Sequence, residues 1–190
     1  GKGQVQVDLV PFSVFSSGQK EEGASTMKIG FVVKDNTSDY WKIVEAGAID
    51  AGKDLGVDVR FNGPNAETEV MQQISMMEDM ITTKVDALVV APSQPNAALS
   101  VFNSAHSAGI PVLLADTDAD WDKKVTFLGT GNIAAGKIGG QYIAEKLGAG
   151  AEIIILRGAL GDLTHDQRSA GAEEAAKAAG CIVVDIQPAD

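Results

Sequence analysis

Cysteine, histidine and basic residues are scarce in this chain of 190 residues. Cys181 is the one cysteine, and there are two histidines. A single cysteine excludes a disulfide within the chain, and a Cys/His metal site needs more ligands of these types than the chain offers. Lysine and arginine together number 15 against 26 aspartates and glutamates, which gives a net charge of −11. An acidic chain is poorly suited to the phosphate backbone of nucleic acids, so nucleic acid is not an expected partner.

Long apolar runs and nucleotide-binding motifs are missing too. No uninterrupted apolar stretch approaches the ~20 residues of a membrane span. The chain has no GxGxxG after its first predicted strand, and no GxxxxGK followed by serine or threonine. No serine or cysteine nucleophile stands in a sharp strand-to-helix turn. We therefore expect a protein without a cofactor and without catalytic activity.

Aliphatic and small residues are what the chain has in quantity. Hydrophobic residues make up 45%, aromatic ones only 5%, and glycines number 21. Short, almost continuously apolar runs alternate with segments of helical periodicity, which is typical of parallel strands covered by helices on both faces. The predicted fold class is therefore α/β, with a doubly wound parallel sheet. Predicted strands are 27–33, 57–61, 87–91, 110–116, 125–130, 152–158 and 181–187, and predicted helices are 39–56, 66–84, 96–108, 133–147 and 163–179.

Ligands of doubly wound sheets bind outside the carboxyl ends of the strands, so the loops there are the place to look for a site. The first of these loops, with the start of its helix, contains Lys34, Ser38, Tyr40 and Trp41. Ser38 is also a suitable cap for that helix. Two adjacent aromatic residues on a helix do not both face the core. One of Tyr40 and Trp41 is therefore expected to face the cleft, where its ring can stack on a sugar face.

Polar side chains also follow the fourth and sixth predicted strands. Asp116 and Thr117 stand at the end of the fourth strand, where a carboxylate can accept hydrogen bonds from vicinal hydroxyl groups. Asp166 and Gln167 lie near the start of the helix after the sixth strand, where they can face the same cleft. For the neighbouring Arg168 we expect a buried, structural role.

Several longer segments carry a family resemblance that covers 27–190. They are MKIGFVVK, the Tyr40–Trp41 pair, GAIDAGKDLGVDVRFNGPNAE, VDALVVAPSQPNAA, AGIPVLLADTDAD, GTGNIAAGKIGGQYIAEKLG and the final QPAD. With these segments the chain resembles the type I periplasmic sugar-binding proteins, the ribose- and galactose-binding group that supplies ABC importers. The resemblance implies two α/β lobes that close on a small polyol about a hinge. It implies a first lobe at 27–131 and a partial second lobe at 132–190, because members of the family are longer.

Two positions depart from the pattern of the ribose binders. Those proteins have an arginine directly after the aspartate of the fourth strand and another in the loop after the sixth, where this chain has Thr117 and Asp166. At Lys34, Asp116 and the Asp166–Gln167 pair, the chain looks similar to receptors for the furanone signal autoinducer-2. The resemblance thus implies a simple sugar or an autoinducer-2-like furanone as the ligand, with Lys34 donating and the carboxylates accepting.

The resemblance also implies partners and a location. The partners are the membrane subunits of an ABC transporter, and the location is the periplasm or another place outside the cytoplasm. Residues 1–26 read as a polar tether or an added segment. Similar spacers follow the anchoring cysteine of bacterial lipoproteins, which leaves a lipid anchor in the precursor open.

Two further expectations concern the whole chain. A partial second lobe would expose strand edges and apolar surface, which predicts self-association. The alternative function is the effector-binding core of a LacI-like transcriptional regulator, which shares this fold. That function would need a helix-turn-helix head before the first strand, and 1–26 is too short for one.

Overall fold

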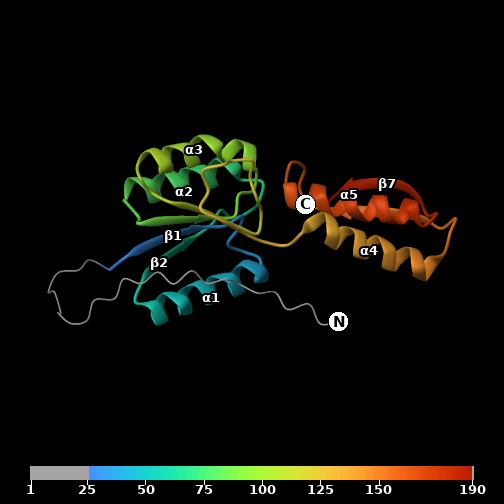
Figure 1. Ribbon diagram of the computed structural model, residues 1–190, viewed down its shortest axis with the longest axis horizontal. Helices are drawn as coiled ribbons and strands as arrows, with labels where there is room; N and C mark the ends of the chain where they lie inside the picture. Colours follow the sequence, from blue (N-terminus) through green and yellow to red (C-terminus); the bar gives the residue numbers. More distant parts are fainter. Residues whose placement is uncertain (1–25, 190) are drawn as a thin grey trace.

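Strands and helices alternate through residues 26–189, the part of the chain that the computed structural model describes, except that two strands follow one another before the fourth helix (Figure 1). The tether expected at 1–26 lies outside these residues, except for Thr26. The alternation confirms the predicted α/β class. In chain order the elements are β1 (Lys28–Val32), α1 (Asp39–Leu55), β2 (Asp58–Asn62), α2 (Val70–Thr82), β3 (Ala87–Val90), α3 (Pro95–Ser107), β4 (Val112–Ala115), β5 (Phe127–Leu128), α4 (Asn132–Leu147), β6 (Glu152–Arg157), α5 (Leu163–Ala178) and β7 (Ile182–Pro188).

Five parallel strands form the first sheet, in the order β2-β1-β3-β4-β5. The chain runs outward from β1 to β2, crosses back to β3 and continues in the opposite direction, so the sheet is doubly wound as predicted. Helix α1 covers one face, and α2 and α3 cover the other (Figure 1). We call β1–β5 with α1–α3 the first lobe. The winding reverses between β1 and β3, and ligands of such sheets bind at the carboxyl ends of the strands near that point.

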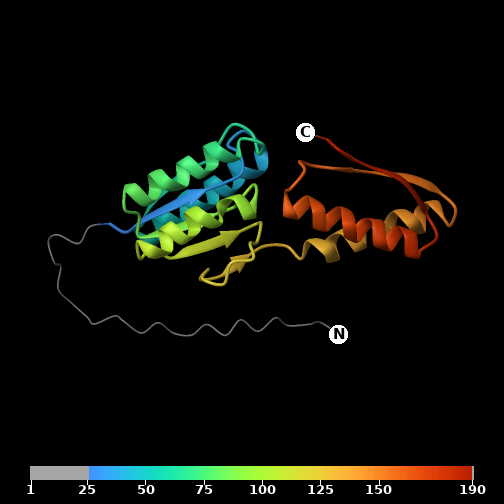
Figure 2. The same cartoon turned by 90° about the horizontal axis from the view of Figure 1, so that it is seen from above.

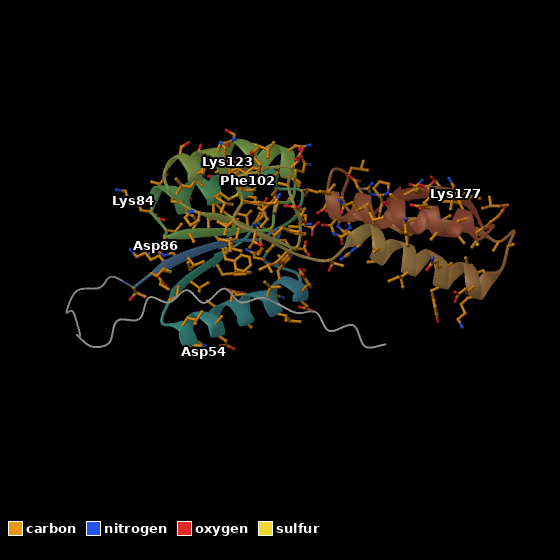
Figure 3. All side chains as sticks on the ribbon, in the orientation of Figure 1. Asp54, Lys84, Asp86, Phe102, Lys123 and Lys177 are labelled. Atoms are coloured by element: carbon orange, nitrogen blue, oxygen red, sulfur yellow. The ribbon has the colours of Figure 1, made fainter. Side chains whose placement is uncertain are left out.

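The core of the first lobe lies mainly between the sheet and the helices α2 and α3. Apolar residues at steps of three and four along both helices face the strands, and Figure 3 shows Phe102 of α3 within this layer. The largest fully buried apolar side chains are Phe102, Met77, Leu88 and Leu114. On the other face, Trp41 of α1 packs in a smaller cluster. This packing fixes the sheet whose strand ends carry the candidate residues.

The last four elements, α4, β6, α5 and β7, form a second lobe around a parallel sheet of two strands. Figures 1 and 2 place this lobe beyond the end of the first sheet toward which the strands run. Helices α4 and α5 approach closely because glycines lie between them: a Cβ on Gly140 would lie 2.3 Å from the carbonyl oxygen of Ala172. A small buried cluster joins these helices to the sheet, and it consists of Ala144, Ala176 and Cys181.

Several element boundaries differ from the prediction. The helix predicted at 66–84 begins at Val70, because the chain first makes a turn in which Glu69 Oε2 accepts a hydrogen bond from the backbone N–H of Asn65. Asp116 has a left-handed backbone with φ of 61°, which ends β4 at Ala115. The strand predicted at 125–130 shortens to β5, which pairs only with the end of β4. None of the helices within 26–189 is long and apolar enough to cross a membrane.

Candidate functional site

Lys34 lies at the centre of the candidate site. It follows β1 at the carboxyl end of the first sheet, and its side chain is 3% exposed. Its ammonium lies 3.4 Å from Asp116 Oδ2 and donates a hydrogen bond to Asp162 Oδ2. Burying an ammonium is costly unless opposite charge accompanies it. The two carboxylates therefore hold Lys34 in place.

Asp116 presents its carboxylate to several groups at once. Oδ1 accepts a hydrogen bond from the Tyr40 hydroxyl at 3.2 Å, and Oδ2 accepts one from the Thr117 hydroxyl at 3.1 Å. Aspartate is one of the few residues that tolerate the left-handed backbone found here. A carboxylate offers about four acceptor positions, so Asp116 keeps capacity for hydroxyl groups of a ligand.

The adjacent aromatic residues differ in burial. Trp41 is 4% exposed and packs in the cluster beneath α1, whereas Tyr40 is 56% exposed. The two rings meet edge-on, with centroids 4.8 Å apart. Ser38 caps α1, because its hydroxyl accepts a hydrogen bond from the backbone N–H of Trp41 at 3.5 Å. The expectation that one ring of the pair is buried and the other is not is confirmed.

The start of α5 supplies the second-lobe side of the site. Asp162 caps this helix, and its Oδ1 accepts hydrogen bonds from the backbone N–H groups of Thr164 at 2.7 Å and His165 at 3.3 Å. The hydroxyl of Thr164 lies 2.8 Å from that of Thr117 in the first lobe. The Lys34–Asp162 ion pair and the Thr117–Thr164 hydrogen bond therefore join the two lobes.

A cavity of about 340 Å³ lies between these contacts. Its lining consists of Lys34, Asp35, Ser38, Tyr40, Trp41, Glu67, Asp116, Thr130, Thr164, His165 and Arg168. The lining includes five of the predicted site residues, which are Lys34, Ser38, Tyr40, Trp41 and Asp116. Thr117 and Gln167 instead line a neighbouring, less polar cavity of about 490 Å³ that shares Thr130 and Thr164 with the first. We place the site in the smaller cavity because the charged groups converge there.

Asp166 and Arg168 lie differently from what the sequence suggested. The carboxylate of Asp166 does not line the cavity, because it forms an ion pair with the guanidinium of Arg157 on β6. Arg168, which we expected to be buried, is exposed and lines the cavity. Its Nε donates a hydrogen bond to Asn132 Oδ1 at 2.9 Å. The second lobe thus contributes Arg168 to the cavity where the sequence suggested Asp166.

The local environment shifts the pKa of two groups in the lining. Burial raises the pKa of the Tyr40 hydroxyl, and the charge of Asp116 and its hydrogen bond raise it further. Burial also raises the pKa of Glu67, where Lys34 opposes the effect and Asp162 adds to it. The Tyr40 hydroxyl therefore stays a neutral donor over a wider pH range than an exposed tyrosine.

One group of side chains has the spacing of metal ligands. Glu67, Asp162 and His165 bring potential ligand atoms within 4.8 Å of one another. Asp162 already uses both oxygens, one for Lys34 and the other for the start of α5. A metal ion would have to displace the buried ammonium, so the chemistry of this group fits an ion network between the lobes better than a metal centre.

Comparison with known proteins assigns this architecture to a family. Residues 29–189 match the family described as a periplasmic binding protein domain. The chain belongs to the periplasmic binding protein family. Its fold and its similarity to ribose- and allose-binding members confirm the predicted resemblance to the type I sugar-binding group.

Individual relatives are similar over most of this chain. The D-ribose/D-allose-binding protein of Pseudomonas aeruginosa is 33% identical over 168 residues, which are 84% of this chain and 53% of that protein. The ribose import binding protein of Bacillus subtilis is 30% identical over 156 residues, 82% of this chain and 49% of that protein. A solved carbohydrate transporter solute binding protein from Agrobacterium radiobacter, in complex with D-arabinose, is 35% identical with a TM-score of 0.81, covering 87% of this chain and 58% of that one. The chain spans about half the length of the curated relatives it matches.

Sequence reasoning missed Glu67, Asp162 and Arg168. Asp162 carries a usable signal, since an aspartate after a glycine and before a helical segment is typical of a helix cap. That signal does not reveal the lysine of the other lobe as a partner. Glu67 lies in a turn beyond the loop that follows β2, and no pattern marks it. Arg168 depends on which side of α5 faces the first lobe, which is a property of the tertiary structure.

Proposed function

We propose that this chain is part of the substrate-binding component of an ABC importer and captures a small polyhydroxylated ligand between its lobes by hinge closure. The observation that carries the proposal is the convergence of Lys34, Tyr40 and Asp116 from separate segments on one cavity of about 340 Å³. Cavities of this size are typical for small ligands. The proposal includes a location outside the cytoplasm and membrane subunits as partners. The import role named for the Bacillus relative supports both.

The chemistry of the lining matches a sugar ring. The Asp116 carboxylate can accept hydrogen bonds from two vicinal hydroxyl groups, and charge assistance strengthens such bonds. Lys34 and Arg168 can donate to ring and hydroxyl oxygens, and the exposed face of Tyr40 can stack on the apolar face of the sugar. Because the lining comes from both lobes, a bound ligand favours the closed arrangement, and closure is the whole mechanism.

A simple sugar is the ligand that we propose first. Ribose, allose and arabinose occur in the names of the relatives and support this choice. The likeness to autoinducer-2 receptors rests on four residues, of which Lys34 and Asp116 line the cavity. Asp166 pairs with Arg157, and Gln167 lines the neighbouring cavity. A furanone is therefore the second candidate.

Isothermal titration calorimetry against D-ribose, D-allose, D-arabinose and autoinducer-2 tests the proposal. We expect one of these ligands to bind, and Asp116→Asn to weaken that binding about 10- to 100-fold, the usual effect of losing a charged acceptor. Asparagine also tolerates the left-handed backbone, so the fold is retained.

Asp86→Asn is the matched control, because Asp86 precedes β3 at the opposite end of the same sheet (Figure 3). It should bind like the unmodified chain. Lack of binding to all four ligands by a chain that melts cooperatively, or equal effects of the two substitutions, would contradict the proposal.

A further inference from the structure

We propose that Asp162 is a positioning residue that couples closure of the lobes to the orientation of Lys34, an inference that rests on the proposed binding function. Asp162 belongs to the second lobe and Lys34 to the first, and both side chains are 3% exposed. Their ion pair therefore forms only when the lobes meet. Asp162 does not line the cavity itself, so it acts on a ligand through Lys34.

The two oxygens of Asp162 have separate tasks. Oδ1 accepts hydrogen bonds from two backbone N–H groups at the start of α5, which fixes the direction of the carboxylate. Oδ2 is thereby directed to the first lobe, where it accepts a hydrogen bond from Lys34. One side chain thus joins the position of α5 to the position of the ammonium. A carboxylate held by its own helix cap loses little side-chain entropy when it meets the lysine.

The ammonium of Lys34 has three N–H donors. Within the first lobe, the ammonium has an ion-pair partner in Asp116, whose Oδ2 lies at 3.4 Å. Closure adds Asp162, which accepts a hydrogen bond from one of the donors, while Asp116 remains an ion-pair neighbour. A remaining donor can reach a ligand oxygen, because Lys34 lines the cavity. Closure of the lobes and orientation of the ligand-binding donor are then one event.

The other direct contact between the lobes has a different character. Thr117 and Thr164 share a neutral hydrogen bond of 2.8 Å. The Thr117 hydroxyl in turn donates a hydrogen bond to the Asp116 carboxylate, so this contact does not act on Lys34 directly. Glu67 and His165 approach to 3.7 Å, beyond hydrogen-bond distance. Of these three contacts across the lobes, the charge-assisted bond of Asp162 is the one that also positions a cavity donor.

Two substitutions separate the positioning role from the capping role. Asp162→Asn keeps a side chain that caps helices as well as aspartate does, but it removes the charge that binds Lys34. Lys34→Gln leaves the cap intact and removes the ammonium. If Asp162 positions Lys34, both variants disturb closure; if it only caps α5, Lys34→Gln leaves closure unchanged.

The first measurement is the distance between spin labels on the two lobes, by pulsed electron paramagnetic resonance without ligand. Asp54→Cys on α1 and Lys177→Cys on α5 supply exposed label sites (Figure 3), and Cys181→Ala removes the native thiol. We expect Asp162→Asn and Lys34→Gln each to shift the distances toward longer values, and the double variant to add nothing further. An unchanged distribution in either single variant would overturn the proposal, and Lys34→Gln decides alone if Asp162→Asn fails to fold.

The second measurement uses D-ribose as the probe in calorimetry. Asp162→Asn should weaken binding about tenfold while the melting temperature stays close to that of the unmodified chain. Glu174→Gln is the control and should bind normally. Glu174 lies on α5, the helix that Asp162 caps, and its substitution removes an exposed ion pair with Lys137 of α4. Because the distances are measured without ligand, they decide the role of Asp162 even if D-ribose fails to bind, and that failure would count against the proposed function alone.

Discussion

Asp116 is the side chain on which most contacts of the site converge. Its carboxylate accepts from the hydroxyls of Tyr40 and Thr117 and lies beside the ammonium of Lys34. Its left-handed backbone turns the chain out of β4 at this point. These contacts use a negative charge, and the backbone here has a positive φ. Few residues other than aspartate combine the two properties.

The Tyr40 hydroxyl reports on this carboxylate. Burial and Asp116 both raise its pKa, so removal of the charge should lower that pKa while the effect of burial remains. Tyr142 is the second tyrosine of the chain, and Tyr142→Phe leaves Tyr40 as the one phenol to titrate. We expect ultraviolet titration to give a pKa above the ordinary value of about 10. Adding Asp116→Asn should move the transition to lower pH, and an unmoved transition would refute the contact.

The sequence predicts the site residues that local patterns mark, but not those that depend on tertiary packing. Lys34 and Asp116 follow strands, and the rule for strand ends in doubly wound sheets is enough to select them. Adjacent aromatics predict one buried ring, but which of Tyr40 and Trp41 is buried depends on how α1 packs. The sequence suggested that Asp166 faces the cavity, because local patterns do not show that Arg157 of β6 lies within ion-pair distance of it.

At the scale of elements, the second lobe depends on glycines between α4 and α5. An added Cβ at Gly140 would lie 2.3 Å from a backbone oxygen of α5, whereas one at Gly139 meets nothing within 4 Å. Both positions lie in α4, so replacing glycine by alanine changes the helix propensity equally at each. A comparison of the two substitutions therefore separates the effect of close packing from that of backbone entropy.

Gly140→Ala should destabilise the second lobe by about 1–3 kcal/mol, since neighbouring backbone must move to admit the methyl group. Gly139→Ala should instead stabilise it by about 0.5–1 kcal/mol, because alanine favours helix and has free space here. Urea denaturation followed by circular dichroism measures both changes. A Gly140→Ala variant as stable as Gly139→Ala would show that the helices are not in close contact at Gly140.

Element type is predicted well from the sequence, and element ends less well. Apolar runs and helical periodicity give each strand and helix of 26–189 in the right order. The misjudged ends depend on single contacts, such as the hydrogen bond between Asn65 and the side chain of Glu69, which delays α2. The shortness of β5 follows from its pairing with β4 alone, at the edge of the sheet.

On the scale of the whole molecule, the lobes have unequal cores. One cluster of fifteen buried residues joins the sheet of the first lobe to α2 and α3, whereas the buried cluster of the second lobe has three. The second sheet has two strands, and a two-stranded sheet is only marginally stable by itself. Its apolar side chains also remain exposed, with Leu156 at 71% and Ile154 at 59%. The second lobe should therefore open before the first.

Hydrogen exchange of backbone amides tests this order. We expect amides of β6 and β7 to exchange at least about tenfold faster than those of β1, β3 and β4, which corresponds to ~1.4 kcal/mol less protection. If self-association covers Leu156 and Ile154, protection of β6 and β7 should fall further when the protein is diluted, whereas β3 should not respond. Equal protection of both sheets at every concentration would show that the second lobe is as stable as the first, and that its exposed apolar side chains cost it no stability.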